Sequence, residues 1–170
     1  ERDQQTFARF YARRMPAEVL LDGLSQVLDV PTDFSGGPGT FPKGIRAVQL
    51  PDENVPSTFL DMFGRPARTS ACECERKDEP ALGQALVLVN SPEIQRKLTH
   101  KNGFVAKLLS QKKTMAQNLD DIFLQVMSRP PSKRELKIAA DFIRSEKNKT
   151  EAYQSLVWSL LATNEFLFNH

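Results

Sequence analysis

Two cysteines separated by a single residue are the chain's most distinctive chemical feature. Cys72 and Cys74 flank Glu73, and in an extended segment side chains two residues apart lie on the same face. The sulfurs could form a disulfide or a reversible thiol pair, supply thiolates to a metal ion, or fill space as small apolar residues. A disulfide over so short a ring would restrict the unfolded chain by only about 1.6 kcal/mol, so it would be a local clamp and not a fold staple.

A metal site needs more ligands than this pair supplies. Closed zinc sites have four protein ligands, and the chain has only His100 and His170 as imidazole donors. The sequence also lacks a Cys-x-x-Cys-His string, which covalent attachment of a c-type haem requires. We therefore expect neither a metal site nor a cofactor in this domain.

Charged residues of both signs surround the cysteines. Glu73 and Glu75 are the closest paired carboxylates, and together with Cys72 and Cys74 they are the candidate catalytic residues. Arginine forks bind carboxylate or phosphate groups through two parallel hydrogen bonds. The candidate binding residues are accordingly Arg65, Arg68 and Arg76. The alternative is that these charges neutralise one another in a solvated turn or in internal ion pairs.

Neither histidine is placed to act as a catalytic base. His100 falls in a basic stretch with Arg96, Lys97 and Lys101, where we expect it to be exposed to solvent. His170 is the final residue of the sequence. No Ser, His and Asp triad can be assembled from the order of residues alone, so hydrolysis at the paired carboxylates has no further support.

The elements that must position these residues are mainly helices. Between residues 1 and 29, apolar side chains recur at steps of three and four, and Pro16 interrupts the pattern. We expect two helices here. The second should begin at Pro16, because the first turn of a helix does not need the missing N–H of proline, and it should end at about Asp29.

The chain changes character between residues 31 and 56. Five prolines and four glycines in this stretch make a continuous helix impossible. We expect an irregular excursion from Pro31 to Pro56, and its length is typical of a linker or of a surface loop that carries function. The segment 45–50 is its one candidate strand, and 68–74 could pair with it.

Start and stop signals predict further helices after this excursion. Ser57 can cap a short helix that Gly64 ends. Pro80 suits the first turn of a helix over 80–89. A third helix over 91–103 begins with a Ser-Pro-Glu signal, and the Asn-Gly pair at its end should close it because both residues tolerate the left-handed conformation.

The last third of the chain has the clearest helical pattern. Five apolar residues fall at i, i+3, i+4, i+7 and i+8, namely Leu119, Ile122, Phe123, Val126 and Met127. A capping box formed by Ser132 and Glu135 begins the next helix. We expect a final helix to start near Thr150, with an apolar face that includes Tyr153 and Val157.

These patterns predict an all-α fold, a helical bundle of antiparallel neighbours with a long Pro/Gly-rich excursion. One short two-stranded ribbon is an option. We expect a single domain over 1–170, with a helical arm or helices at 1–30, the irregular loop at 31–56 and a helical core at 57–170.

Composition excludes several classes of protein. With 40% hydrophobic and 26% charged residues, the chain has the balance of a globular protein and not of a wholly disordered one. The net charge of +2 is too small to predict nucleic-acid or anionic-membrane binding. We expect no membrane span in this chain, because it contains no apolar run of about 18 residues.

Several short strings occur in an order that resembles a known family. They are RMPAE (14–18), QLPD (49–52), FGRP (63–66), CECER (72–76), SRPP (128–131) and NEFLFNH (164–170). From about Phe7 to His170 the chain resembles the planctomycete-specific domain of unknown function that lies C-terminal in large proteins, often with a cytochrome c-like haem domain. The resemblance implies a periplasmic or cell-envelope location, and haem only in a separate domain of the full-length protein. It supplies no catalytic residues.

Two functions of different classes follow. The first is a non-catalytic docking or assembly domain of a cytochrome-linked envelope protein, whose partners are neighbouring domains of the same polypeptide or another envelope protein. The alternative is a thiol-redox or hydrolytic enzyme domain, with its site around Cys72–Arg76 and completed by the loop at 31–56. A concave pocket walled by both segments, with buried Arg and Glu side chains converging on it, would favour the enzyme, and a flat apolar patch would favour docking.

Overall fold

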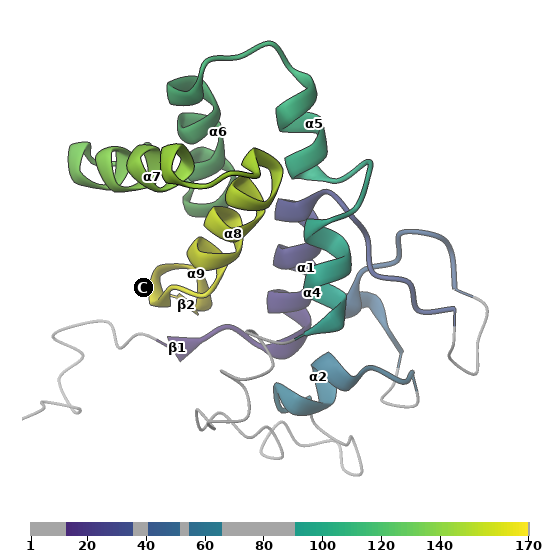
Figure 1. Ribbon diagram of the computed structural model, residues 1–170. Helices are drawn as coiled ribbons and strands as arrows, with labels where there is room; N and C mark the ends of the chain where they lie inside the picture. Colours follow the sequence, from purple (N-terminus) through teal and green to yellow (C-terminus); the bar gives the residue numbers. More distant parts are fainter. Residues whose placement is uncertain (1–12, 36–40, 52–54, 66–90, 170) are drawn as a thin grey trace, which may run out of the picture.

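The computed structural model describes residues 13–35, 41–51, 55–65 and 91–169, and these form an all-α bundle (Figure 1). The helices are α1 (Ala17–Leu28), α2 (Thr58–Met62), α4 (Pro92–Leu98), α5 (Phe104–Ser110), α6 (Met115–Met127), α7 (Lys133–Ser145), α8 (Lys149–Leu161) and α9 (Asn164–Leu167). A 3₁₀ helix, η1 (Ala47–Gln49), and two strands of two residues, β1 (Arg13–Arg14) and β2 (Phe168–Asn169), complete the described elements.

Helix α1 is the element around which the N-terminal half packs. Its side chains at Leu20, Leu21, Leu24 and Leu28 are completely or almost completely buried, and the helix contacts α2, α4, α5 and η1. The helix ends at Asp29, as the sequence predicts, and this residue has the left-handed conformation with φ 54°. The helix therefore supplies the fixed wall against which later segments are placed.

The N-terminal side of Pro16 is extended and not helical, so the expectation of a helix up to Pro16 is wrong for residues 13 and 14. Arg13 and Arg14 pair in antiparallel fashion with Asn169 and Phe168, and Met15 N–H donates to Leu167 O at 3.1 Å. A residue that precedes proline is pushed away from the helical region, which leaves its neighbours available to pair as a strand. The earlier part of the expected first helix lies outside the described residues.

The segment 45–50 is not a strand, contrary to expectation. Its backbone forms η1, and the Asp22 carboxylate of α1 accepts hydrogen bonds from Ala47 N at 2.6 Å and from Val48 N at 3.2 Å. These amides are therefore bonded to a side chain and not to a partner strand. The expected partner, 68–74, lies outside the described residues.

The described parts of the 31–56 excursion contribute to the core. Its backbone is irregular apart from η1, as predicted. Its apolar side chains at Phe34, Ala47, Leu50 and Val55 are buried, with exposures of 1–6%. The excursion is therefore fastened to the bundle at several points along its length and is more than a surface loop.

Local capping signals begin several helices as predicted. Ser57 Oγ accepts a hydrogen bond from Leu60 N at 3.3 Å, and Ser91 Oγ accepts one from Ile94 N at 3.4 Å. Gly64 after α2 has a φ of 81°, which favours glycine. The helix expected over 80–89 lies outside the described residues.

The region 91–103 contains a break that the sequence does not predict. Helix α4 ends at Leu98, and Gly103 precedes α5 as its N-cap with a φ of −80°. The role of Gly103 is therefore not a left-handed turn. A Cβ at this position would lie 3.1 Å from Lys97 O and 3.2 Å from Val30 Cγ2, so the absence of a side chain allows α5 to begin close to α4.

The C-terminal helices bury the face that the sequence predicts. Ile122, Phe123, Ile143 and Val157 are each no more than 2% exposed, and the capping box of Ser132 and Glu135 is present. Helix α8 begins at Lys149, near Thr150 as predicted, and Asn148 caps it. Figure 1 shows α7 lying crosswise to α6, so these neighbours are crossed and not uniformly antiparallel.

Candidate binding cleft

A cleft of about 830 Å³ opens beside α1, between three segments that are distant in sequence. Its walls are the chain after α1 (30–34), α2 with the turn before it (56–62), and α4 with its flanking residues (91–100). Phe34, Phe59 and Met62 give it an apolar lining. Its volume lies within the range of about 300–1,000 Å³ that is usual for ligand sites.

A buried lysine joins two of these walls. The Lys97 side chain in α4 is only 4% exposed. Its ammonium donates to Val30 O at 2.7 Å, to Thr32 Oγ1 at 3.0 Å and to Ser25 Oγ at 3.1 Å. Because an ammonium has three protons, every proton of Lys97 has an acceptor in α1 or in the chain that leaves it.

The surroundings of Lys97 lower its pKa to about 8. Burial is the main cause, because it disfavours the charged form, and the nearby Glu93 carboxylate acts in the opposite direction. A lysine with a lowered pKa can be a nucleophile or a base. In this cleft, however, the amine is fully engaged by the chain's own oxygens, so Lys97 positions the wall and does not present a reactive group.

Sequence reasoning did not single out Lys97, although a signal was present. Ile94 and Leu98 are buried on the inner face of α4, and Lys97 lies three residues after the first and one before the second. Residues at i, i+3 and i+4 share one helix face. The spacing thus places Lys97 on the buried side, while its position within a basic stretch suggests a solvated one.

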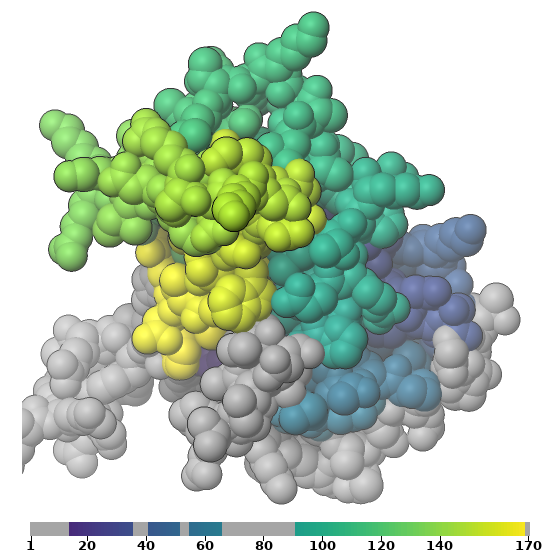
Figure 2. All heavy atoms as spheres, in the orientation of Figure 1, coloured from purple at the N-terminus to yellow at the C-terminus, as the bar shows by residue number. Residues whose placement is uncertain are grey.

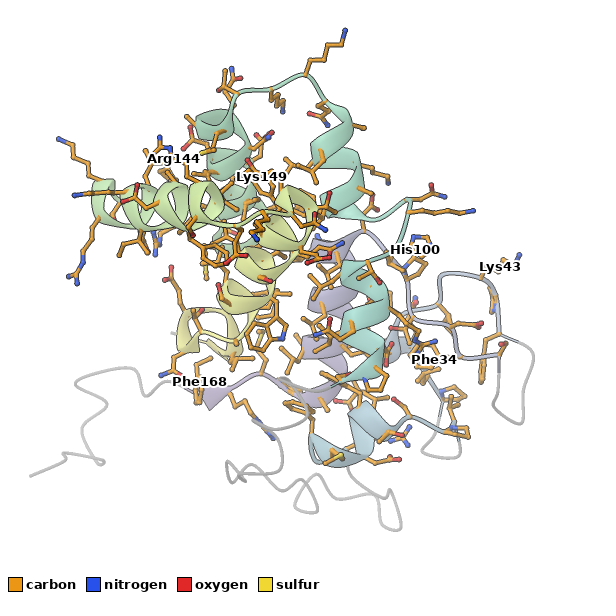
Figure 3. All side chains as sticks on the ribbon, viewed as in Figure 1. Phe34, Lys43, His100, Arg144, Lys149 and Phe168 are labelled. Carbon is orange, nitrogen blue, oxygen red and sulfur yellow. The ribbon has the colours of Figure 1, made fainter. Side chains whose placement is uncertain are left out.

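The rim of the cleft carries free polar groups of both signs. Arg96 Nε donates weakly to Pro92 O at 3.4 Å, and Arg96 makes no ion pair within the described part of the chain. His100 is exposed, as predicted, and its Nδ1 accepts from Asn102 N at 3.2 Å, which leaves Nε2 for a ligand. Figure 3 shows His100 and Phe34 on the same side of α4.

Asp33 supplies negative charge on the opposite wall. Its Oδ1 accepts a hydrogen bond from Ser35 N at 2.9 Å, and bonds from Ser35 hold the pKa of this exposed carboxyl below its usual value, with a smaller contribution from the charge of Lys43. Asp33 is therefore ionised near neutral pH. The cleft thus offers a carboxylate on one wall and a guanidinium on the other.

Most of the residues that the sequence nominated lie outside the described residues. These are Arg68, Cys72, Glu73, Cys74, Glu75, Arg76 and His170. Arg65 is described, and its side chain is 7% exposed. It donates to Val55 O at 2.9 Å and to Asp61 Oδ1 at 2.5 Å. Arg65 therefore fastens α2 to the chain before it and does not line the cleft.

The described residues contain no cluster of three or more His, Cys, Asp or Glu side chains that could hold a metal ion. Two acidic side chains of the cleft also interact with groups of the chain itself. Glu93 lies 3.7 Å from the Lys97 ammonium, and Asp33 is bonded to its own turn. The Ser25 hydroxyl lies 3.1 Å from the Lys97 ammonium but donates its own proton to Leu21 O at 2.8 Å, so these two groups are also engaged in structural bonds.

Comparison with known proteins identifies the family. A family model named PSD1, described as a protein of unknown function (DUF1553), matches residues 1–143. The chain belongs to the PSD1 family. No curated protein and no solved structure matches it significantly. The PSD1 description names no activity, so the function has to be argued from the cleft and the surface.

The folded unit of this PSD1 chain extends beyond the matched residues. The match ends at residue 143, inside α7. Three side chains of α8, Tyr153, Val157 and Leu161, nevertheless belong to the same hydrophobic core as α1. Helix α8 is therefore an integral part of this bundle, because removing it would expose the apolar faces of the helices that it covers.

Proposed function

We propose that this PSD1 chain is a non-catalytic docking domain whose cleft receives a segment of a neighbouring domain or of another cell-envelope protein. This proposal is supported by the different roles of the charged side chains in the cleft. Lys97 is consumed by structural hydrogen bonds, while the apolar lining and the charges of Arg96 and Asp33 are presented to a ligand. Such a cleft is prepared to bind a ligand.

A polypeptide segment suits this cleft better than a ligand of a single charge sign. Met62 lines the cleft, is 43% exposed and offers apolar contact, and the rim offers both a cation at Arg96 and an anion at Asp33. A peptide can present apolar side chains between charges of both signs, as most protein interfaces do. A nucleic acid would instead require a dominant positive surface, and the net charge of the chain is only +2.

The cytochrome-linked, periplasmic setting is the part of this proposal that rests on the ordered motifs alone. In this setting haem is held by a separate domain of the full-length protein, and the present domain binds no cofactor. Haem staining of the full-length product and of the present chain, after separation of periplasm and cytoplasm, tests both statements. Haem in the isolated chain, or a cytoplasmic full-length product, would contradict this setting and would leave the proposed docking role unaffected.

Photo-crosslinking tests the cleft directly. Met62 lines the cleft and is 43% exposed, and Val48 is 45% exposed and does not line it. A photoreactive phenylalanine analogue at each position in turn, in the full-length protein in its own cells, makes a matched pair. We expect a discrete adduct from position 62, mapped to one segment of a neighbouring domain or envelope protein, and none from position 48.

Two further variants decide whether such an adduct reports binding in the cleft. Arg96→Glu should abolish it by removing the rim cation, and Arg144→Glu, on the distant helix α7, should leave it unchanged. Adducts of equal yield from positions 62 and 48, or an adduct indifferent to Arg96→Glu, would contradict docking in the cleft. Thiol-disulfide exchange or hydrolysis that is lost in Cys72→Ser/Cys74→Ser would favour the enzyme alternative.

A further inference from the structure

Helix α7 carries an exposed apolar pair on a surface unrelated to the cleft. Ile138 is 60% exposed and Phe142 is 36% exposed, and their spacing of four residues places them next to each other on one side of the helix. Figure 1 shows α7 away from the cleft helices α2 and α4, and Figure 2 shows α7 side chains standing out at the edge of the molecule.

The fold of the described chain does not require this pair. Helix α7 already packs against α6 and α8, and Ala139 and Ile143 provide its buried contacts. A side chain as large as Phe142 ordinarily gains about 1.5–3 kcal/mol from complete burial. The exposed pair therefore retains apolar surface that a partner can cover.

Three cations lie along the exposed side of α7, beside the pair. The side chains of Lys133, Arg134 and Lys137 make no ion pair or hydrogen bond within the described part of the chain. Arg134 lies one turn before Ile138 on the same side, and Lys133 and Lys137 follow the neighbouring side of the helix. The two acids of α7 are already occupied. Asp141 accepts from Arg144 at 3.1 Å, and Glu135 accepts two hydrogen bonds from Arg129, at 2.8 and 3.0 Å.

We propose that this surface, the α7 face (Lys133, Arg134, Lys137, Ile138 and Phe142), docks an acidic amphipathic helix of a partner protein. Apolar side chains of the partner would cover Ile138 and Phe142, and its carboxylates would meet the three uncompensated cations. Paired apolar anchors one turn apart with a complementary charged border are the usual means of recognising a helix. The interaction does not depend on the cleft, so either surface can be inactivated without the other.

The small number of apolar groups favours a protein partner over a lipid surface. A helix that lies in a bilayer interface buries a wide apolar face. In α7 the apolar side chains Ala139 and Ile143 are buried in the core, and the exposed large apolar residues of this helix are Ile138 and Phe142. The positive charge is also confined to a small part of the surface, since the chain as a whole has a net charge of only +2, which gives little general attraction to an anionic membrane.

Synthetic peptides provide the test. The probe is an amphipathic helical peptide of about 18 residues, or five turns, with leucines on one face and glutamates on the other. The control peptide has lysine in place of every glutamate. Binding is followed by fluorescence anisotropy at two salt concentrations, and backbone amide NMR shifts locate the contact. We expect the acidic peptide to bind, with shifts concentrated in 133–145, and the basic peptide to bind at least about tenfold more weakly.

Two variants and one control distinguish the α7 face from unspecific adhesion. Ile138→Ser/Phe142→Ser should weaken the acidic peptide by about tenfold or more, while Leu124→Ser, which changes a 51% exposed leucine of α6, should not. Arg134→Glu/Lys137→Glu should reverse the preference towards the basic peptide. Circular dichroism confirms that each variant is folded.

Three results would overturn the proposal. The first is equal binding of both peptides, and the second is binding that persists in Ile138→Ser/Phe142→Ser. The third is failure of the acidic peptide to bind while vesicles with about one third anionic lipid do so through Ile138 and Phe142, because that outcome would assign the face to a membrane.

Discussion

The Lys97 ammonium in α4 donates a 2.7 Å hydrogen bond to the backbone carbonyl of Val30, 67 residues earlier in the chain. Val30 follows the left-handed residue Asp29 that ends α1. Val30 lies beyond the helix, so its carbonyl takes no part in the hydrogen bonds of α1, and Lys97 ties the chain that leaves α1 to α4. This bond fixes two walls of the cleft relative to each other.

Lys97→Met should therefore destabilise the protein while preserving the apolar stem of the side chain. We expect a loss of about 1–3 kcal/mol in the free energy of unfolding, because Val30 O and the Ser25 and Thr32 hydroxyl groups lose a shared donor. Arg96→Met, one residue earlier and exposed, should change stability by less than about 0.5 kcal/mol. Urea unfolding of both variants makes the comparison, and equal midpoints would contradict the role of Lys97.

The lowered pKa of Lys97 predicts a pH dependence with a definite sign. The folded state releases this proton at about pH 8 and the unfolded state at about the ordinary value of 10.5. Between these values the unfolded state binds more protons, so the contribution of Lys97 to stability rises with pH. Stability of the wild type minus that of Lys97→Met should increase from pH 8 to 10.5. A difference that is constant or falling over this range would be inconsistent with a lowered pKa.

The opposite pH range tests Glu135. Hydrogen bonds from Arg129, and then from Ser132, lower the pKa of Glu135 to about 2 from an ordinary value of 4.5. The stabilisation is complete above about pH 4.5 and is lost as the pH falls towards 2. Because the pair is partly exposed, we expect Glu135→Gln to cost only about 1 kcal/mol at neutral pH.

Acid titration of unfolding free energies provides the measurement for Glu135. The difference in unfolding free energy between the wild type and Glu135→Gln should disappear between pH 4.5 and 2. Glu146 is an exposed acid at the other end of α7, and the unfolding free energy of Glu146→Gln should change with pH as that of the wild type does. If the unfolding free energy of Glu135→Gln also changed with pH as that of the wild type does, the Glu135 carboxylate would make no contribution to stability.

Phe123 tests the core of the C-terminal helices. Its side chain is 2% exposed, and Phe123→Ala should cost about 3–5 kcal/mol, the usual range for deletion of a buried ring. The next residue is a convenient control, because Leu124 is 51% exposed. Leu124→Ala should cost less than about 1 kcal/mol. Comparable losses in the two variants would mean that the inward face of α6 has been assigned incorrectly.

Hydrogen exchange tests the excursion at 31–56. We expect its described amides to exchange faster than those of 119–127, because few of them belong to regular structure. The Ala47 amide should be an exception, since the Asp22 carboxylate accepts it at 2.6 Å. In Asp22→Ala this amide should become as fast as its neighbours. Slow exchange throughout the excursion would instead make the whole segment part of the stable core.

The sequence predicts those features that depend on residues close together in the chain. Ser57, Ser91 and Ser132 each cap a helix by accepting from an amide three residues later, so a short window contains the whole signal. The conformation of 45–50 depends instead on Asp22, 25 residues away from Ala47. Gly103 similarly faces Lys97 O and Val30, and no local pattern contains that contact.

The candidate site divides in the same way. Ser57 and Ser91 are readable as helix starts, but their meeting around one cleft with residues 30–34 depends on tertiary packing. The burial of Lys97 has the same origin, because its three acceptors all lie in or just after α1. Residue type alone drew attention to the cysteines, whose position lies outside the described residues.

The pairing of β1 with β2 has a mechanical consequence. Arg13 lies opposite Asn169, so chain before the one and chain after the other depart from the same end of a ribbon only two residues long. A pull applied between these two points would load the ribbon's hydrogen bonds one after another, as a zipper is opened. The hydrogen bonds of the ribbon would therefore break before tension reached the helices, while the chain itself stayed continuous.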